Sequence, residues 1–161
     1  MLKKIKEALP TYIVAVALPL AVGVISALLT RENMDIYSEL NTPPLSPPSW
    51  LFPIAWTILY TLMGISSGMV FLNRGLNREA ADRGLSVYFI SLVVNFGWSI
   101  IFFNMRAFLF AFIWLLLLVY LIIRTILYYK RVSPLAAYLQ IPYLVWVLFA
   151  GYLNIGIYLL N

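Results

Sequence analysis

The stretch from residue 47 to residue 64 reads PPSWLFPIAWTILYTLMG. The prolines at its start lack a backbone N–H and restrict the residues before them, so this part cannot continue a helix. After Trp50 the side chains are apolar, aromatic or small and polar, and Pro53 is compatible with the first turn of a helix. A helix of about 20 apolar residues crosses the bilayer core of about 30 Å. The stretch therefore predicts a proline-rich turn that leads directly into a membrane-spanning helix.

The composition of the whole chain indicates the same environment. The chain has 161 residues, of which 63% are hydrophobic, 16% aromatic and only 11% charged. Soluble domains are about 45–50% apolar and about 25% charged. A chain of this length cannot bury such an excess of apolar surface in its own interior, so the excess is expected to face lipid.

The residue types that the sequence lacks exclude several classes of function. The chain has no Cys and no His. This excludes disulfides, thiolate and histidine metal sites, serine–histidine triads and His-ligated haem. We also expect no nucleic-acid partner. The basic residues behind the net charge of +5 sit at the ends of apolar segments, whereas a nucleic-acid site needs a basic stripe on a folded surface.

Charge-free windows divide the chain into apolar segments, each long enough for one membrane-spanning helix. Arg124 extends the shortest window, because its long stem can reach back to the interface. Pro19 and Pro142 are expected to bend the first and the last helix. The chain is thus predicted to be a single all-α domain over residues 1–161, an integral membrane bundle of five transmembrane helices. The spans are expected near residues 9–29, 50–72, 85–103, 107–128 and 134–159.

Lys and Arg in the short connections predict the orientation, because they are enriched on the cytoplasmic side. Eight of them lie on the side of the N-terminus, and only Arg31 and Arg106 lie on the other. The eight are Lys3, Lys4, Lys6, Arg74, Arg78, Arg83, Lys130 and Arg131. We therefore expect a cytoplasmic N-terminus and a C-terminus outside.

The connection over residues 31–49 is the longest and holds four prolines in the six residues from Pro43 to Pro48. It is expected to be extended and stiff. Two interpretations remain open. The connection is either a rigid turn that positions the second helix or a lid over a cavity between the helix ends.

The tryptophans indicate an aromatic cavity in the half of the membrane that adjoins this connection. Trp56 and Tyr60 share one helical face, and Asn95 and Trp98 share another. Aromatic belts at the interface do not account for Trp98 or Trp146, which lie too deep. The Asn95 amide, near mid-membrane, needs a partner from a neighbouring helix or from a ligand. These faces predict a cavity walled by Trp, Phe and Ala, suited to a flat and largely apolar ligand.

Small residues four apart predict close helix packing. Gly64 and Gly68 form a GxxxG pattern in the second span, and Gly23 and Ala27 have the same spacing in the first. The spacing does not distinguish packing within one bundle from packing between two chains.

The segment from Pro47 to Gly64 closely resembles the signature of the TspO/MBR family. That family includes the bacterial tryptophan-rich sensory proteins and the mitochondrial translocator protein. The resemblance continues in Asn95-Phe96-Gly97-Trp98, in PYLVWVLFA over residues 142–150, and in Leu153-Asn154. It covers nearly the whole chain in the same order.

The resemblance implies a five-helix bundle of a bacterial cell membrane that is often a homodimer. It implies binding of porphyrins such as protoporphyrin IX, of sterols and of benzodiazepine-site drugs, with no obligatory cofactor. It places the family's pocket among the first, second, third and fifth helices, beneath the first loop. Carried over residue by residue, the ligand-binding side chains are Ala27, Trp50, Phe52, Trp56, Asn95, Trp98, Phe110, Trp146, Ala150 and Leu153.

Three classes of function remain open. The first is a porphyrin-binding membrane receptor with a tetrapyrrole sensing, transport or stress-response role, in which Arg31 and Arg106 could pair with the propionates. The second is a light-dependent porphyrin-degrading enzyme with a tryptophan as electron donor. The chain offers no conventional acid–base pair, so we assign no catalytic residue. The third is a carrier of small hydrophobic molecules, although the chain shows no internal repeat.

Overall fold

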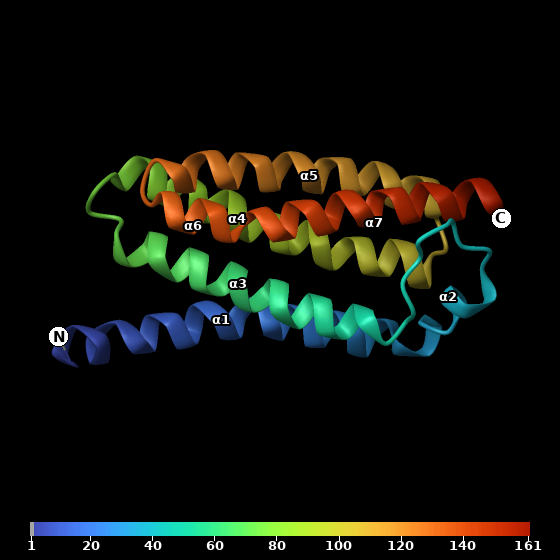
Figure 1. Ribbon diagram of the computed structural model, residues 1–161, viewed down its shortest axis with the longest axis horizontal. Coiled ribbons are helices and arrows are strands. Elements are labelled where there is room, and N and C mark those ends of the chain that lie inside the picture. Colours follow the sequence, from blue (N-terminus) through green and yellow to red (C-terminus); the bar gives the residue numbers. More distant parts are fainter. Residues whose placement is uncertain (1) are drawn as a thin grey trace.

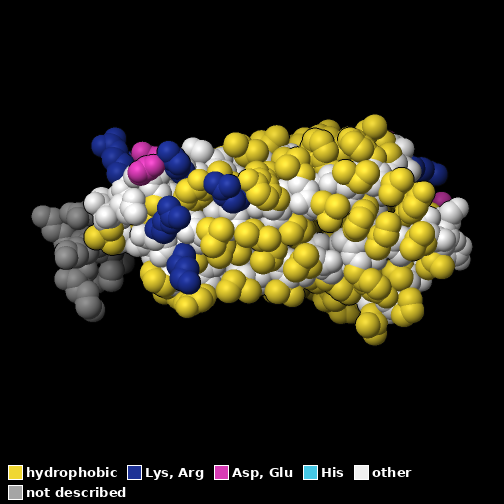
Figure 2. All heavy atoms as spheres, turned by 90° about the horizontal axis from the view of Figure 1, so that it is seen from above, with side chains coloured by type: hydrophobic (Ala, Val, Ile, Leu, Met, Phe, Trp, Pro, Cys, Tyr) yellow, Lys and Arg dark blue, Asp and Glu magenta, His cyan; other side chains and the backbone are white. Residues whose placement is uncertain are grey.

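The computed structural model describes residues 2–161, with side chains from Ala8 onward. Over these residues, five helical segments are long and apolar enough to cross a membrane. They cover Ala8–Asn33, Leu51–Leu72, Arg78–Asn104, Phe108–Lys130 and Pro134–Leu160. The segments lie side by side along the long axis of the molecule (Figure 1). The surface shown in Figure 2 is mostly apolar, and its basic side chains gather toward the end where the N-terminus lies. The prediction of an all-α bundle is confirmed, and the chain is an integral, multi-pass membrane protein.

Helices α1 (Leu2–Thr30) and α3 (Leu51–Leu72) pack through the glycines of the GxxxG pattern. A Cβ on Gly64 would collide with the backbone of Val16, and a Cβ on Gly68 would lie 2.9 Å from Cδ1 of Tyr12. Residues without a side chain let two helix backbones approach this closely. The pattern therefore serves a contact between two helices of the same chain.

Helix α4 (Arg78–Ser99) begins two turns before Leu85, the residue at which the sequence predicts the start of the third span. Asn77 caps its N-terminus, because Oδ1 accepts a hydrogen bond from the backbone N–H of Ala80 at 3.1 Å. The first two turns then carry i,i+4 ion pairs, with Arg83 2.9 Å from Glu79 and Arg78 3.7 Å from Asp82. A search for charge-free windows misses these turns because they are polar and lie at the membrane surface.

The helix after Ser99 widens into a π-helical segment, Ile100–Asn104. Its end is marked by the backbone N–H of Met105, which donates to the carbonyl of Ile100 at 3.0 Å. Arg106 follows with a φ of 53°, in the left-handed region, and reverses the chain into α5 (Phe108–Lys130). Such π segments are frequent at functional sites.

The last span consists of two helices, α6 (Pro134–Leu139) and α7 (Ile141–Leu160). Regular helix is interrupted at Gln140, two residues before Pro142, because proline has no N–H to donate and its ring crowds the preceding turn. The polar groups at this point are paired. Gln140 donates from Nε2 to Ser66 at 3.1 Å, and Ser66 donates to the carbonyl of Ala136 at 2.7 Å.

The connection over residues 31–49 is only partly extended, which corrects the expectation for this segment. It begins with a 3₁₀ turn, Arg31–Asn33, and a single helical turn, α2 (Ile36–Glu39). Residues 31–40 contain no proline, so they are free to form these turns. From Asn41 to α3 the chain has no regular secondary structure and turns at residues 44–45 and 49–50, with Leu45 at a φ of 67°. We call residues 41–50 the proline strap.

The glycine contact predicts a difference between two substitutions. Gly64→Ala places a methyl group against the Val16 backbone and should destabilise the fold by about 1–3 kcal/mol, although Ala is the better helix former. Gly151→Ala is the matched control, because its methyl group meets only Phe112 Cε2 at 3.9 Å. Thermal unfolding in detergent measures both. Equal stability of the two variants would show that α1 and α3 can move apart to accommodate the added methyl group without losing stability.

Candidate functional site

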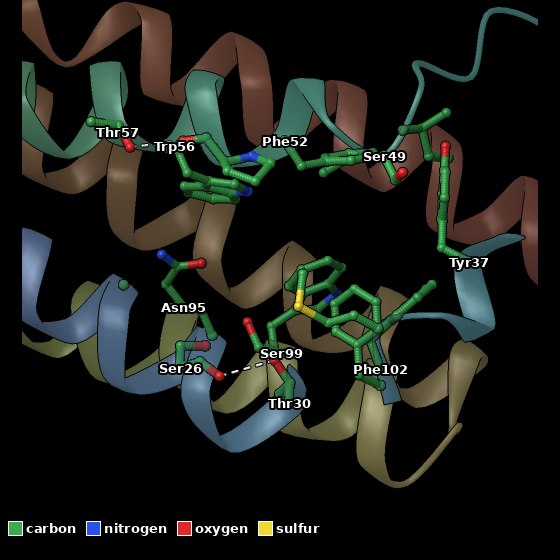
Figure 3. A pocket seen from close by; sticks show the side chains of 18 of the residues that line it. Ser26, Thr30, Tyr37, Ser49, Phe52, Trp56, Thr57, Asn95, Ser99 and Phe102 are labelled. Atoms are coloured by element: carbon green, nitrogen blue, oxygen red, sulfur yellow. Dashed lines mark hydrogen bonds between the residues drawn. The ribbon is translucent and has the colours of Figure 1, made fainter. Parts of the chain in front are cut away.

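A cavity of about 550 Å³ lies between α1, α3, α4 and α7, at the end of the bundle that carries the proline strap. Figure 3 shows aromatic side chains on facing sides of the open space. The cavity has the size of a small-molecule site, since such sites are about 300–1,000 Å³.

Helix α3 supplies one aromatic wall. Phe52, Trp56 and Tyr60 recur every four residues, so they lie on one face of the helix. The rings of Trp56 and Tyr60 are stacked, with centroids 5.3 Å apart and planes inclined by 28°. This pair forms a broad, flat surface toward the cavity.

Helix α4 and the π-helical segment after it supply the facing wall, with Asn95 and Trp98 on α4 and Phe102 on the π-helical segment. Asn95 is only 2% exposed, and its Nδ2 donates to the hydroxyl of Tyr60 at 2.9 Å. No side chain or backbone group of the described residues donates to its Oδ1. The Asn95 amide therefore ties the two walls together and leaves one acceptor for a ligand.

Trp98 is held by a hydrogen-bonded chain through three helices. Its Nε1 donates to Oδ1 of Asn154 in α7 at 3.0 Å, and Nδ2 of Asn154 donates to the carbonyl of Phe108 in α5 at 2.7 Å. A buried indole N–H needs such a partner. The bond fixes the indole, so the wall is formed before any ligand enters.

Helix α1 closes the cavity with small side chains. Gly23 has no room for a Cβ, because the ring of Tyr60 occupies that place. Farther along the helix, Ser26, Ala27 and Thr30 line the cavity. The Thr30 hydroxyl donates a hydrogen bond to the backbone carbonyl of Ser26 at 2.9 Å (Figure 3). Small residues on α1 opposite large rings on α3 leave the space between the helices empty.

The segment before the strap forms the roof with Met34, Asp35 and Tyr37. The Tyr37 ring meets Phe52 edge to face at 5.1 Å, and its hydroxyl donates to the carbonyl of Pro47 at 3.2 Å. Burial raises the pKa of Tyr37 above its ordinary value, so the hydroxyl stays protonated at neutral pH and remains a donor. Tyr37 thereby links the roof to the strap.

The strap is fastened to α7. Asn161 donates from Nδ2 to the carbonyl of Asn41 at 2.9 Å and accepts from its backbone N–H at 3.0 Å. The Tyr152 hydroxyl donates to the carbonyl of Pro44 at 2.8 Å. Gly156 lets Pro43 pack against the helix backbone, since a Cβ there would lie 2.6 Å from Pro43 Cγ.

The structure brings together eight of the ten side chains expected at the site. These are Ala27, Trp50, Phe52, Trp56, Asn95, Trp98, Ala150 and Leu153. Trp146 lies outside the wall, one turn deeper on α7 than Ala150, where Phe52 and Trp56 cover it at centroid distances of 6.1 and 6.4 Å. Phe110 lies on α5, which does not border the cavity. It is 47% exposed and packs on Trp114.

Several lining residues were absent from the sequence-based set. Periodicity had placed Tyr60, Phe102 and Asn154 on or beside the helical faces of expected residues, but the set carried over from the family left them out. Asp35 and Tyr37 carried no such pattern, because they lie in the turns over residues 31–40 that the sequence did not predict.

The cavity wall carries little charge. Asp35 is the one carboxylate among the lining residues, and neither Lys nor Arg contributes to the wall. Arg31 is exposed and does not line the cavity, and Arg106 borders a separate surface groove beside Phe110. The described site is thus suited to a ligand held by burial and ring contact rather than by ion pairs.

Fold and cavity together define a class: a multi-pass α-helical membrane protein with an aromatic, small-molecule-sized cavity between its helices at one end. The sequence model of the TspO/MBR family matches residues 15–160, and the chain belongs to that family. It is 39% identical over 152 residues to the tryptophan-rich protein TspO of Chlorobaculum tepidum, which covers 94% of this chain and 96% of that protein.

Two further relatives extend the comparison. The chain is 37% identical over 138 residues to the translocator protein of Bos taurus, with 85% of this chain and 82% of that protein covered. It is 30% identical over 151 residues to the tryptophan-rich sensory protein of Cereibacter sphaeroides, with 94% and 89% covered.

The fastening of the strap predicts how one substitution changes its motion. Tyr152→Phe removes the hydrogen bond to Pro44, worth about 1 kcal/mol, and should raise the open population of the strap about fivefold. Hydrogen exchange of the Asn41 backbone N–H, which is bonded to Asn161, reports that opening. Tyr138→Phe is the control, because Tyr138 is 61% exposed and lies on α6. Unchanged exchange in Tyr152→Phe would mean that this bond does not hold the strap.

Proposed function

We propose that the protein is a membrane receptor for flat, largely apolar molecules, with porphyrins such as protoporphyrin IX as the first candidates. Its role would be tetrapyrrole sensing, transport or a stress response. The observation that carries the proposal is the pair of facing aromatic walls. One is Trp56 with Tyr60 on α3, and the other is Trp98 at the end of α4 with Phe102 in the π-helical segment that follows. Flat rings gain from burial and from stacking against such walls. The family resemblance gives the porphyrin as the ligand class.

The chemistry of the wall favours a metal-free porphyrin. The chain has no His or Cys to serve as the usual axial ligand of a haem iron. The Asn95 acceptor and the Tyr37 hydroxyl offer polar contacts at two different depths. These groups would orient a ligand, while the rings provide most of the contact area.

The lipid phase is the proposed route of entry. Val24 on α1 and Trp50 before α3 belong to the cavity wall and are 59% and 64% exposed, so the cavity reaches the outer surface between these two helices. An apolar ligand dissolved in the bilayer would meet this opening directly. The proline strap would then act as a lid that shields the cavity from water.

Porphyrin binding can be tested with variants of the two walls. Trp98→Phe and Trp56→Phe should each weaken binding of protoporphyrin IX about two- to tenfold, because the smaller ring loses stacking area. Porphyrin absorbance during titration of purified protein measures the affinity. Phe110→Leu is the matched control, since it removes an aromatic ring outside the cavity and should leave affinity unchanged.

Equal affinity of all three variants and the wild type would rule out the cavity as the porphyrin site. A loss confined to Phe110→Leu would move the site to the groove on α5.

We propose that the N-terminus is cytoplasmic, on the basis of the eight-to-two distribution of basic residues. The chain has no Cys, so single cysteines can report the topology. Leu45→Cys on the strap and Leu76→Cys between α3 and α4 change leucines that are 85% and 76% exposed. A membrane-impermeant maleimide added to intact cells should label the first and spare the second. Labelling of Leu76→Cys alone would reverse the orientation.

A further inference from the structure

The end of the bundle opposite the cavity carries an arginine that is fixed by its own helix. Tyr120, Arg124 and Tyr128 are four residues apart on α5 and share one face. Arg124 donates from Nη2 to the Tyr128 hydroxyl at 2.7 Å and from Nη1 to the Tyr120 hydroxyl at 3.0 Å. Its guanidinium carbon also lies 5.2 Å from the Tyr128 ring centroid. Two neutral phenols therefore hold this cation in place without neutralising it.

Two further arginines converge on Tyr128. The guanidinium carbon of Arg131 lies 5.9 Å from the Tyr128 ring centroid. Arg83 of α4 is the third, because α4 and α5 pack closely at the next residue, where a Cβ on Gly84 would lie 3.0 Å from Tyr128 Cβ. We call Arg83, Arg124 and Arg131 the arginine cluster.

The arginine cluster has an excess of positive charge. Arg83 pairs with Glu79 at 2.9 Å. Among the side chains from Ala8 onward, neither Arg124 nor Arg131 has a carboxylate within ion-pairing distance. The guanidinium carbons of Arg124 and Arg131 both lie within 6 Å of the Tyr128 ring centroid, and like charges that share such a neighbourhood repel one another, more strongly near a medium of low dielectric constant. An anion between the guanidinium groups would remove the repulsion.

The position of the cluster indicates where that anion comes from. Arg124 lies six residues before Lys130, the last residue of α5, and therefore about 9 Å along the helix axis from its end. Its neighbours Ile123 and Leu127 are 41% and 52% exposed, as expected of a lipid-facing surface. Figure 2 shows basic side chains at the border of the apolar surface and within it. A group at this depth meets lipid headgroups more readily than soluble ions.

We propose that the arginine cluster binds the phosphate of an anionic phospholipid, whose acyl chains lie along Ile123 and Leu127. Guanidinium groups bind phosphate oxygens through paired N–H donors. The tyrosines take one N–H from each terminal nitrogen of Arg124, and the other three N–H groups of the planar guanidinium remain for a phosphate. This site is separate from the cavity, which lies at the other end of the bundle. It requires no ligand in the cavity.

Native mass spectrometry of the full chain in detergent tests the site by counting bound lipids. Phosphatidylglycerol should bind the wild type at least fivefold more tightly than phosphatidylcholine of the same chain length. Arg124→Gln and Arg131→Gln should each reduce this preference about fivefold. Arg124→Lys keeps the charge but loses the planar guanidinium, so it should retain only part of the preference for phosphatidylglycerol. This variant replaces Arg124→Gln in the test if the Gln variant does not fold.

Arg74→Gln is the matched control, since Arg74 lies at the same end of the bundle, 4.4 Å over the ring of Phe71 and apart from the cluster. It should leave the lipid preference unchanged. Equal binding of the two lipids by the wild type would overturn the proposal. An equal loss of lipid preference in Arg74→Gln and in Arg124→Gln would also overturn it, because the preference would then depend on the net charge of the protein and not on the cluster. Displacement of the lipid by an equal concentration of glycerol phosphate would also overturn it, by showing a site for soluble anions.

Discussion

The close contact of α1 with α3 at Gly64 sets the position of everything at the cavity end of the bundle. The glycine lets the two backbones touch near mid-membrane, because a single methyl group would already collide with Val16. Toward the strap the large side chains lie on α3 and the small ones on α1, so the helices stay close while the space between them remains open. The cavity is therefore a consequence of how large and small residues alternate across one helix pair, and the rings of Trp56 and Tyr60 form its wall.

The polar side chains inside the bundle give this apolar fold its fixed geometry. Lipid offers no hydrogen-bond partners, so buried amides bond to one another or to the backbone. Asn95 joins α4 to α3 through Tyr60, and Asn154 joins α7 to α4 and α5 through Trp98 and Phe108. At the opposite end Gln140 and Ser66 join α7 to α3 where the last span is interrupted. The aromatic walls are held in place by a small number of directional bonds.

The two ends of the molecule differ in chemistry. The strap end has an apolar cavity with Asp35 as the one carboxylate of its wall, and the strap is fastened to α7 by neutral hydrogen bonds. The other end carries the arginines around Tyr128 at the border of the apolar surface. A ligand that enters from the bilayer and a lipid headgroup that binds at the surface would thus meet different ends, so the two proposals can fail separately.

The sequence by itself determined the spans, the proline strap and the faces that carry Trp56 and Trp98. Segment length, proline content and helical period are local properties, and the family motifs lie on the same residues. The start of α4 was not predicted because its capped first turns are charged.

Only the tertiary structure decided which helical face points toward the cavity. Trp146 belongs to a predicted face but is covered by the rings of α3, Phe110 lies on a helix that does not border the cavity, and Tyr37 reaches the roof through an unpredicted turn. Periodicity places a residue on its own helix, whereas membership of a wall depends on how that helix is rotated against its neighbours, and packing between segments far apart in the sequence sets that rotation.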